Sequence, residues 1–98
     1  MDFKVRISEA ALTDFEEILN YSWINFPATA EQFANAILNH IDLLKMFPYI
    51  GSSVEGRIGV RQLVHIPILI YYRVDDGSRL VEILHFQHGS RHIPDKLD

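Results

Sequence analysis

The spacing of apolar residues changes soon after the start of the chain. Residues 3–7 alternate apolar and charged side chains, which is the two-residue period of a half-buried strand. Beyond them, apolar side chains recur every three or four positions as far as Phe26, which is the period of an amphipathic helix. Ser8 is a suitable N-cap for this helix, and Pro27 marks its end. We therefore predict a short strand followed by a helix over residues 9–25.

A second apolar stripe of helical period begins only a few residues later. Thr29 can cap this second helix, and its apolar face continues to about Met46 before Phe47-Pro48 stops it. Because the connection between the two predicted helices is so short, we expect them to pack as an antiparallel hairpin.

The second half of the chain has the composition of strands and turns. Residues 48–58 are rich in glycine, serine and proline and predict a loop, and Asp75-Asp76-Gly77-Ser78 is a strong hairpin signal. Three runs of β-branched and aromatic residues predict strands over residues 60–65, 68–74 and 80–86. The last segment, residues 87–98, is expected to be irregular.

The resulting order of elements is β-α-α-β-β-β, which is typical of an α+β domain. We predict a single domain over residues 1–98, in which the helical hairpin covers one face of an antiparallel sheet. The pattern does not fix the position of the first strand in that sheet.

Some side chains on the predicted helices carry more specific expectations. Trp23 and Phe26 follow the apolar stripe and are expected in the core, whereas Tyr21 lies off the stripe. Asp14 and Glu17 are expected on an ordinary solvated face of the first helix.

Composition narrows the possible chemistry. The chain contains no cysteine, which excludes disulfides, thiolate zinc sites and a cysteine nucleophile. No apolar stretch is long enough for a membrane span, and the N-terminus lacks the apolar segment of a signal peptide. From these features we expect a soluble cytoplasmic protein with no membrane partner.

Charge is unevenly distributed along the chain. The net charge is −4; residues 1–56 hold three basic and eight acidic side chains, and residues 57–98 hold six basic and five acidic ones. Four of the five histidines also lie in the second part. An acidic chain is a poor general binder of nucleic acid, because such binding depends on cations that neutralise phosphates.

Several motifs, taken in order, resemble the ParE/RelE family of toxins. Each motif is weak alone, but their order along nearly the whole chain is specific. They are Val5-Arg6-Ile7-Ser8 leading into Ala10-Ala11-Leu12-Thr13-Asp14-Phe15, Phe47-Pro48-Tyr49-Ile50-Gly51, Val60-Arg61-Gln62-Leu63, Ile70-Tyr71-Tyr72-Arg73-Val74-Asp75, and Val81-Glu82-Ile83-Leu84 followed by His88-Gly89-Ser90-Arg91.

The resemblance implies a toxin neutralised by a co-expressed antitoxin, so we expect a hetero-oligomer of the two. The antitoxin would bind as a helix in a groove or as a strand added to a sheet edge. The family has two branches: RelE-like members are ribosome-dependent mRNA endonucleases, whereas ParE-like members poison DNA gyrase.

Three features favour the ParE-like branch. The resemblance implies that RelE-like toxins carry an arginine at a central-strand position that falls near Leu69 in this chain. An apolar side chain such as leucine cannot bind a phosphate. The His88-Gly89-Ser90-Arg91 ending is similar to ParE-like toxins, and the acidic net charge points the same way. We therefore predict a gyrase inhibitor with no catalytic residue of its own and no cofactor.

Two alternatives remain open. In the first, the chain is a ribosome-dependent mRNA endonuclease that uses His85, His88 and Arg91, since histidine can act as acid or base near neutral pH. In the second, it is an inactive family member that serves as a binding module. The two histidines lack a third ligand at a recognisable spacing, so we predict no metal site.

Four residues are predicted to contact the target or the antitoxin. Arg61 and Arg73 lie on predicted neighbouring strands, where pairing with Glu82 or simple solvation is the alternative role. His88 and Arg91 belong to the final motif, where they could instead anchor the end of the chain to the sheet.

Overall fold

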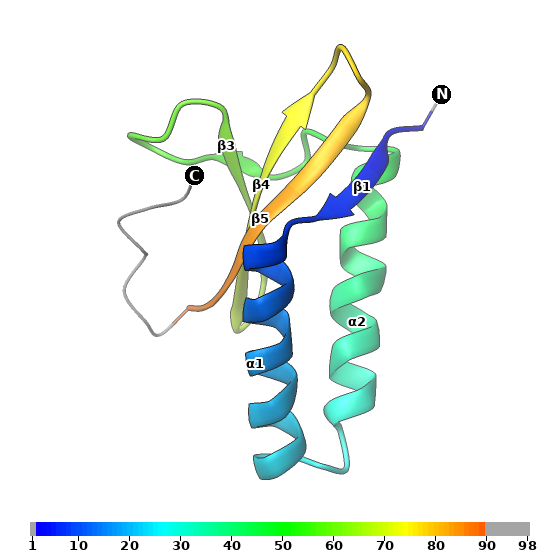
Figure 1. Ribbon diagram of the computed structural model, residues 1–98, viewed down its shortest axis with the longest axis vertical. Helices are drawn as coiled ribbons and strands as arrows, with labels where there is room; N and C mark the ends of the chain where they lie inside the picture. Colours follow the sequence, from blue (N-terminus) through cyan, green and yellow to red (C-terminus); the bar gives the residue numbers. More distant parts are fainter. Residues whose placement is uncertain (1, 90–98) are drawn as a thin grey trace.

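Five strands form one mixed sheet, and two helices cover one of its faces (Figure 1). This computed structural model describes residues 2–89, and it confirms the predicted α+β class and the two helices. The elements are β1 (Lys4–Ile7), α1 (Glu9–Asn25), α2 (Ala30–Asp42), the 3-10 turn η1 (Leu43–Lys45), β2 (Ser52–Ser53), β3 (Val60–His65), β4 (Ile68–Asp75) and β5 (Leu80–His88).

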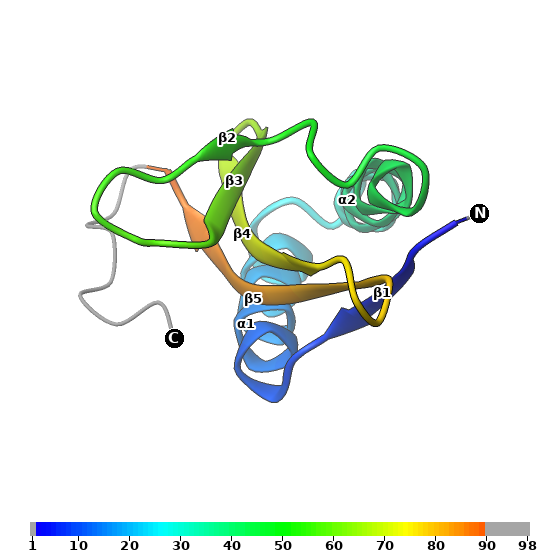
Figure 2. The same ribbon diagram turned by 90° about the horizontal axis from the view of Figure 1, so that it is seen from above.

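The sheet has the strand order β1-β5-β4-β3-β2. The strands from β2 to β5 pair in antiparallel fashion, as expected, but β1 pairs in parallel with β5. The prediction of a wholly antiparallel sheet is therefore corrected to a mixed sheet. A parallel neighbour needs a crossover connection, and here the helical hairpin belongs to that connection. In the view from above, both helices are seen end-on, with α1 next to β5 (Figure 2).

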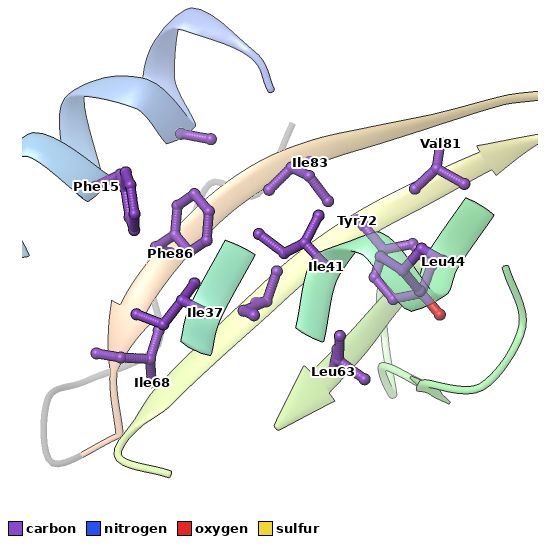
Figure 3. Packing of buried hydrophobic residues seen from close by; sticks show 12 residues of the cluster. Phe15, Ile37, Ile41, Leu44, Leu63, Ile68, Tyr72, Val81, Ile83 and Phe86 are labelled. Carbon is purple, nitrogen blue, oxygen red and sulfur yellow. The ribbon is translucent and has the colours of Figure 1, made fainter. Parts of the chain in front are cut away.

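The core lies between the helices and the sheet (Figure 3). Its side chains share one face of the sheet and the inner stripe of each helix, in agreement with the predicted periodicities. The buried members are Ala11, Phe15, Ile37, Ile41, Leu44, Leu63, Ile68, Ile70, Tyr72, Val81, Ile83 and Phe86. A smaller cluster of Val60, Tyr71 and Leu84 lies on the opposite face of the sheet.

The cap predicted for the first helix is confirmed, whereas that of the second helix is wrong in detail. The Ser8 hydroxyl accepts a hydrogen bond of 3.1 Å from the Ala11 amide and donates one of 3.2 Å to the Leu84 carbonyl. Thr29 lies at the N-cap of α2, but its side chain makes no capping bond. Ser8 thus fixes both the start of α1 and its position against β5.

A bulge interrupts β5 near its centre. Tyr72 pairs with Ile83 and the preceding Tyr71 pairs with His85, so Leu84 is an extra residue on β5. A bulge of this kind redirects the side chains that follow it.

None of the helices within residues 2–89 is long and apolar enough to cross a membrane.

Candidate functional site

Beyond its centre, β5 loses its strand neighbour on one side. β1 ends at Ile7, opposite Ile83, and no other strand among the described residues pairs with β5 on that side. A strand edge leaves backbone N–H groups that need acceptors. Asp14 of α1 supplies one, because its Oδ2 accepts a hydrogen bond of 3.1 Å from the Phe86 amide.

The same carboxylate oxygen holds His85. The Nδ1 atom of His85 lies 2.9 Å from Oδ2 of Asp14, and the two side chains retain 19% and 27% of their exposure respectively. A carboxylate at Nδ1 fixes the orientation of an imidazole ring and selects the Nδ1–H tautomer. The expectation that Asp14 lies on an ordinary solvated face is therefore wrong. Asp14 lies three positions after Ala11 and four before Ile18, so the helical spacing already placed it beside the apolar stripe.

A groove of about 800 Å³ adjoins this pair. It lies between the distal half of the helical hairpin and the ends of β4 and β5, and we call it the hairpin groove. Both helices extend further along the long axis of the molecule than the strands beside them do (Figure 1). Its apolar lining consists of Ile18, Tyr21, Phe26, Ala30, Phe33, Pro67, Ile68 and Phe86.

Two of the aromatic side chains along α1 are more exposed than the sequence predicts. Trp23 and Phe26 are each more than half exposed, so their placement in the core was wrong. The apolar stripe continues about one turn beyond the point where the sheet covers it. Tyr21, which was set apart from the stripe, is exposed at the groove as well.

The ionisable groups of the hairpin groove are acids and histidines. Asp14 and Glu17 come from α1, and His85 and His88 come from β5. No lysine or arginine among residues 2–89 lines the groove. The fold thus brings together the two histidines that the sequence singled out, while Arg91 lies outside the described residues. A search of the same part of the chain finds no group of three or more metal-ligating side chains.

Arg61 is bound to the loop before β2. Its guanidinium donates hydrogen bonds to the Gly51 carbonyl, at 2.6 Å from Nη2 and 3.1 Å from Nε, and it lies over the ring of Tyr49. The Gly51 amide in turn donates a bond of 3.0 Å to the hydroxyl of the buried Tyr72. Arg61 therefore holds this loop against β3 and β4.

Arg73 lies on the other face of the sheet. The pairing of β3 and β4 places Arg61 opposite Tyr72 and Arg73 opposite Val60, so the two arginines do not form one patch. Arg73 is exposed, and it stands across from Glu82, the partner named in the alternative role. The ion pair of Glu82, however, is with Arg6 of β1, at 2.7 Å. A role of Arg61, Arg73 and His88 in target binding stays a prediction.

Sequence reasoning missed a second pair of histidines. His40 in the last turn of α2 and His65 at the end of β3 bring their Nδ1 atoms within 2.8 Å, and the ring of Phe33 lies against His65. One ring must donate to the other, so a second proton at this contact is unfavourable. Burial lowers the pKa of His65, and the electrostatic interaction with His40 lowers that pKa further. The two residues are 25 positions apart, and only the fold brings them together.

This pair is expected to weaken the fold as the pH falls. Because the pKa of His65 is lower in the folded chain than its ordinary value of 6.5, the unfolded chain takes up the proton first. Stability should therefore be complete above pH 6.5 and decline as the pH drops below it. The measurement is the free energy of unfolding in urea at pH 7.5 and pH 5.5, for the wild type and for His65→Gln. The variant should lose less stability between the two pH values, and an equal loss in both proteins would contradict this account.

The sequence of this chain matches a known protein family over most of its length. Residues 5–93 match the family described as the ParE toxin of the type II toxin–antitoxin system parDE. The chain belongs to the ParE toxin family. The resemblance predicted from the ordered motifs is thereby confirmed, and with it the assignment as a toxin component of a type II toxin–antitoxin system.

Solved structures of toxins from such systems share the fold of this ParE-family chain. A chain from the chromosomal ParDE system of P. aeruginosa is 19% identical and superposes with a TM-score of 0.75, covering 88% of this chain and 95% of its own length. A chain from the RelBE2 toxin–antitoxin complex of Mycobacterium tuberculosis is 21% identical, with a TM-score of 0.69 and coverage of 90% and 99%. The isolated RelE toxin of E. coli is 15% identical, with a TM-score of 0.60 and coverage of 92% and 87%. A comparison with curated protein sequences gives no match.

Leu69, near the central-strand position that the resemblance singled out, lies on the outer face of this ParE-family sheet. Leu69 is partly buried there against the cluster of Val60, Tyr71 and Leu84. These contacts are apolar and suit leucine, and its directly opposite strand neighbours are Val64 and Gln87.

Proposed function

We propose that this ParE-family chain inhibits DNA gyrase through direct protein contact in the cytoplasm, and that an antitoxin neutralises it. Cleavage of RNA would require a cation at the scissile phosphate beside the catalytic acid and base. The observation that supports the gyrase proposal most is the apolar environment of Leu69, where RelE-like toxins carry such a cation. The hairpin groove, which holds both histidines, is likewise lined by no lysine or arginine of residues 2–89.

One observation keeps the endonuclease as the second candidate. The Asp14–His85 pair has the carboxylate–imidazole geometry that orients histidine bases in many enzymes. In that function His85 would act as acid or base, and the phosphate would be bound by a cation from outside the described residues. The two candidates thus differ in product: broken plasmid DNA or cut message.

A two-part assay with purified, antitoxin-free protein separates the candidates. One reaction contains gyrase, supercoiled plasmid and ATP, and the other contains ribosomes translating a defined message. We expect linear plasmid to accumulate while the message stays intact. Cut message with unchanged plasmid would refute the gyrase proposal, and His85→Ala would then test whether the histidine pair performs the cleavage. No effect in either reaction would favour the inactive binding module.

The antitoxin is proposed to occupy the hairpin groove with an amphipathic helix. Tyr21 and Phe26 present apolar surface there that the rest of the described chain leaves more than half exposed. Groove-bound helices and added strands are the two common ways in which a partner segment docks. A strand needs free backbone groups at a sheet edge, whereas at the open edge of β5 the Phe86 amide already donates to Asp14, and both helices wall the groove.

A further inference from the structure

We infer that the hairpin groove selects a helix carrying a lysine or arginine, which pairs with Glu17 and the neighbouring Asp14. This inference rests on the proposed antitoxin for the identity of the partner. It concerns the charge of the partner helix, and it is drawn from the residues that line the groove.

The first step is the position of the two carboxylates. Asp14 and Glu17 are three residues apart on α1, so they lie on the same side of the helix, and both line the groove. Asp14 already accepts hydrogen bonds from His85 and from the Phe86 amide. Glu17 is exposed, and its side chain forms no ion pair or hydrogen bond with another residue in the described part of the chain. Glu17 is therefore available to a partner.

The second step is the cost of covering them. A helix that buries Tyr21, Phe26 and Phe33 must also remove water from the acidic side of the groove. Removing water from a carboxylate is unfavourable unless a cation or donors replace it. Among residues 2–89 no lysine or arginine lines the groove, so in this inference a basic side chain of the partner supplies the cation.

The third step is selectivity. A partner that presents a carboxylate at this position would meet two like charges as well as the desolvation cost, and would be rejected. The groove therefore favours a helix with apolar residues at positions i, i+3, i+4 and i+7 and a basic residue beside them. A second copy of this chain is the competing occupant.

The test uses a displayed library of 16-residue helical peptides with that apolar pattern and two randomised flanking positions. The targets are the wild type, Glu17→Lys and Glu16→Lys. Glu16 is the matched control, because it is an exposed acid on the same helix that does not line the groove. We expect lysine or arginine to be enriched on the wild type and on Glu16→Lys, and aspartate or glutamate on Glu17→Lys.

Selected peptides are then synthesised in a lysine and a glutamate version and titrated by fluorescence anisotropy. The lysine version should bind the wild type about tenfold more tightly than the glutamate version, and Glu17→Lys should reverse that order. Tyr21→Ala should weaken binding, whereas Ile24→Ala, which is exposed outside the groove, should not. The inference would be overturned if no helical peptide bound, or if the Glu16 and Glu17 variants changed the peptide preference equally. It would also be overturned if sedimentation showed a dimer of this chain that Glu17→Lys alone dissociates, because a second copy would then occupy the groove.

The two proposals fail in different experiments. If the protein neither breaks plasmid with gyrase nor cuts message, the toxin function fails, whereas the charge preference of the groove still stands. If the plasmid is broken but the Glu17 variant does not change the preference, only the groove inference fails.

Discussion

Replacing Ile37 by alanine is expected to lower the free energy of unfolding by about 2–5 kcal/mol. Ile37 is fully buried on α2 and belongs to the cluster that joins both helices to the sheet. Figure 3 shows it beside Ile68 and Phe86, so truncation leaves a cavity where α2 meets the ends of β4 and β5. A domain of this size has only about 5–15 kcal/mol of stability in total, so the loss is a large share of it.

Leu38→Ala is the matched control for this prediction. Leu38 follows Ile37 on the same helix but retains 39% of its exposure. Its truncation removes less buried surface and should cost well under half as much. Urea unfolding monitored by circular dichroism gives both free energies, and a similar loss for the two variants would show that α2 packs through a different face.

The helices and the last three strands could be predicted from sequence because their signals are local. The apolar stripe around Ile37 and the Asp75-Asp76-Gly77-Ser78 turn each lie within one short stretch of chain. By contrast, the parallel pairing of β1 with β5 joins Lys4 to Leu80, and no local pattern specifies that neighbour. The two-residue strand β2 forms only because β3 offers it a pairing edge, so it too escaped the prediction.

The candidate site likewise has a part that could be predicted from local sequence and a part that depends on contacts between distant segments. His85 and His88 were found as a pair near the end of a strand, but Asp14, which binds His85, and Glu17, which lines the same groove, come from α1 near the other end of the chain. Sequence spacing placed Asp14 next to the apolar stripe without showing that a strand edge ends beside it. The His40–His65 contact carried no sequence signal at all, because each histidine is isolated in its own element.

The apolar stripe on α1 extends beyond the part of the helix that the sheet covers. Periodicity indicates which face of a helix is apolar, but it does not reveal whether the same chain covers that face. The stripe continues to Phe26, past the reach of the sheet, and the uncovered part is the wall of the hairpin groove. The error in placing Phe26 in the core thus marks the surface that we propose for the antitoxin.

Removing the carboxylate of Asp14 is the second substitution with a large expected effect. Asp14→Ala takes the acceptor from the Phe86 amide and from the His85 ring at once. An acceptor lost at a partly buried position costs about 1–3 kcal/mol. Alanine is the better helix former and recovers roughly 0.5 kcal/mol of this. We therefore expect a net loss of about 1–2 kcal/mol of stability, with faster hydrogen exchange at the Phe86 amide.

Two comparisons separate the hydrogen bonds of Asp14 from its charge and from its place on the helix. Asp14→Asn keeps an oxygen that can accept from the Phe86 amide, so it should retain slow exchange there while it loses the negative charge beside His85. Glu16→Ala removes an exposed acid from the same helix and should change stability by no more than about 0.5 kcal/mol. If Asp14→Ala matched Glu16→Ala in stability and left the exchange of Phe86 unchanged, the carboxylate would not be what closes the edge of β5. If exchange rises in the alanine variant alone, Asp14 takes the place of a neighbouring strand at this end of β5.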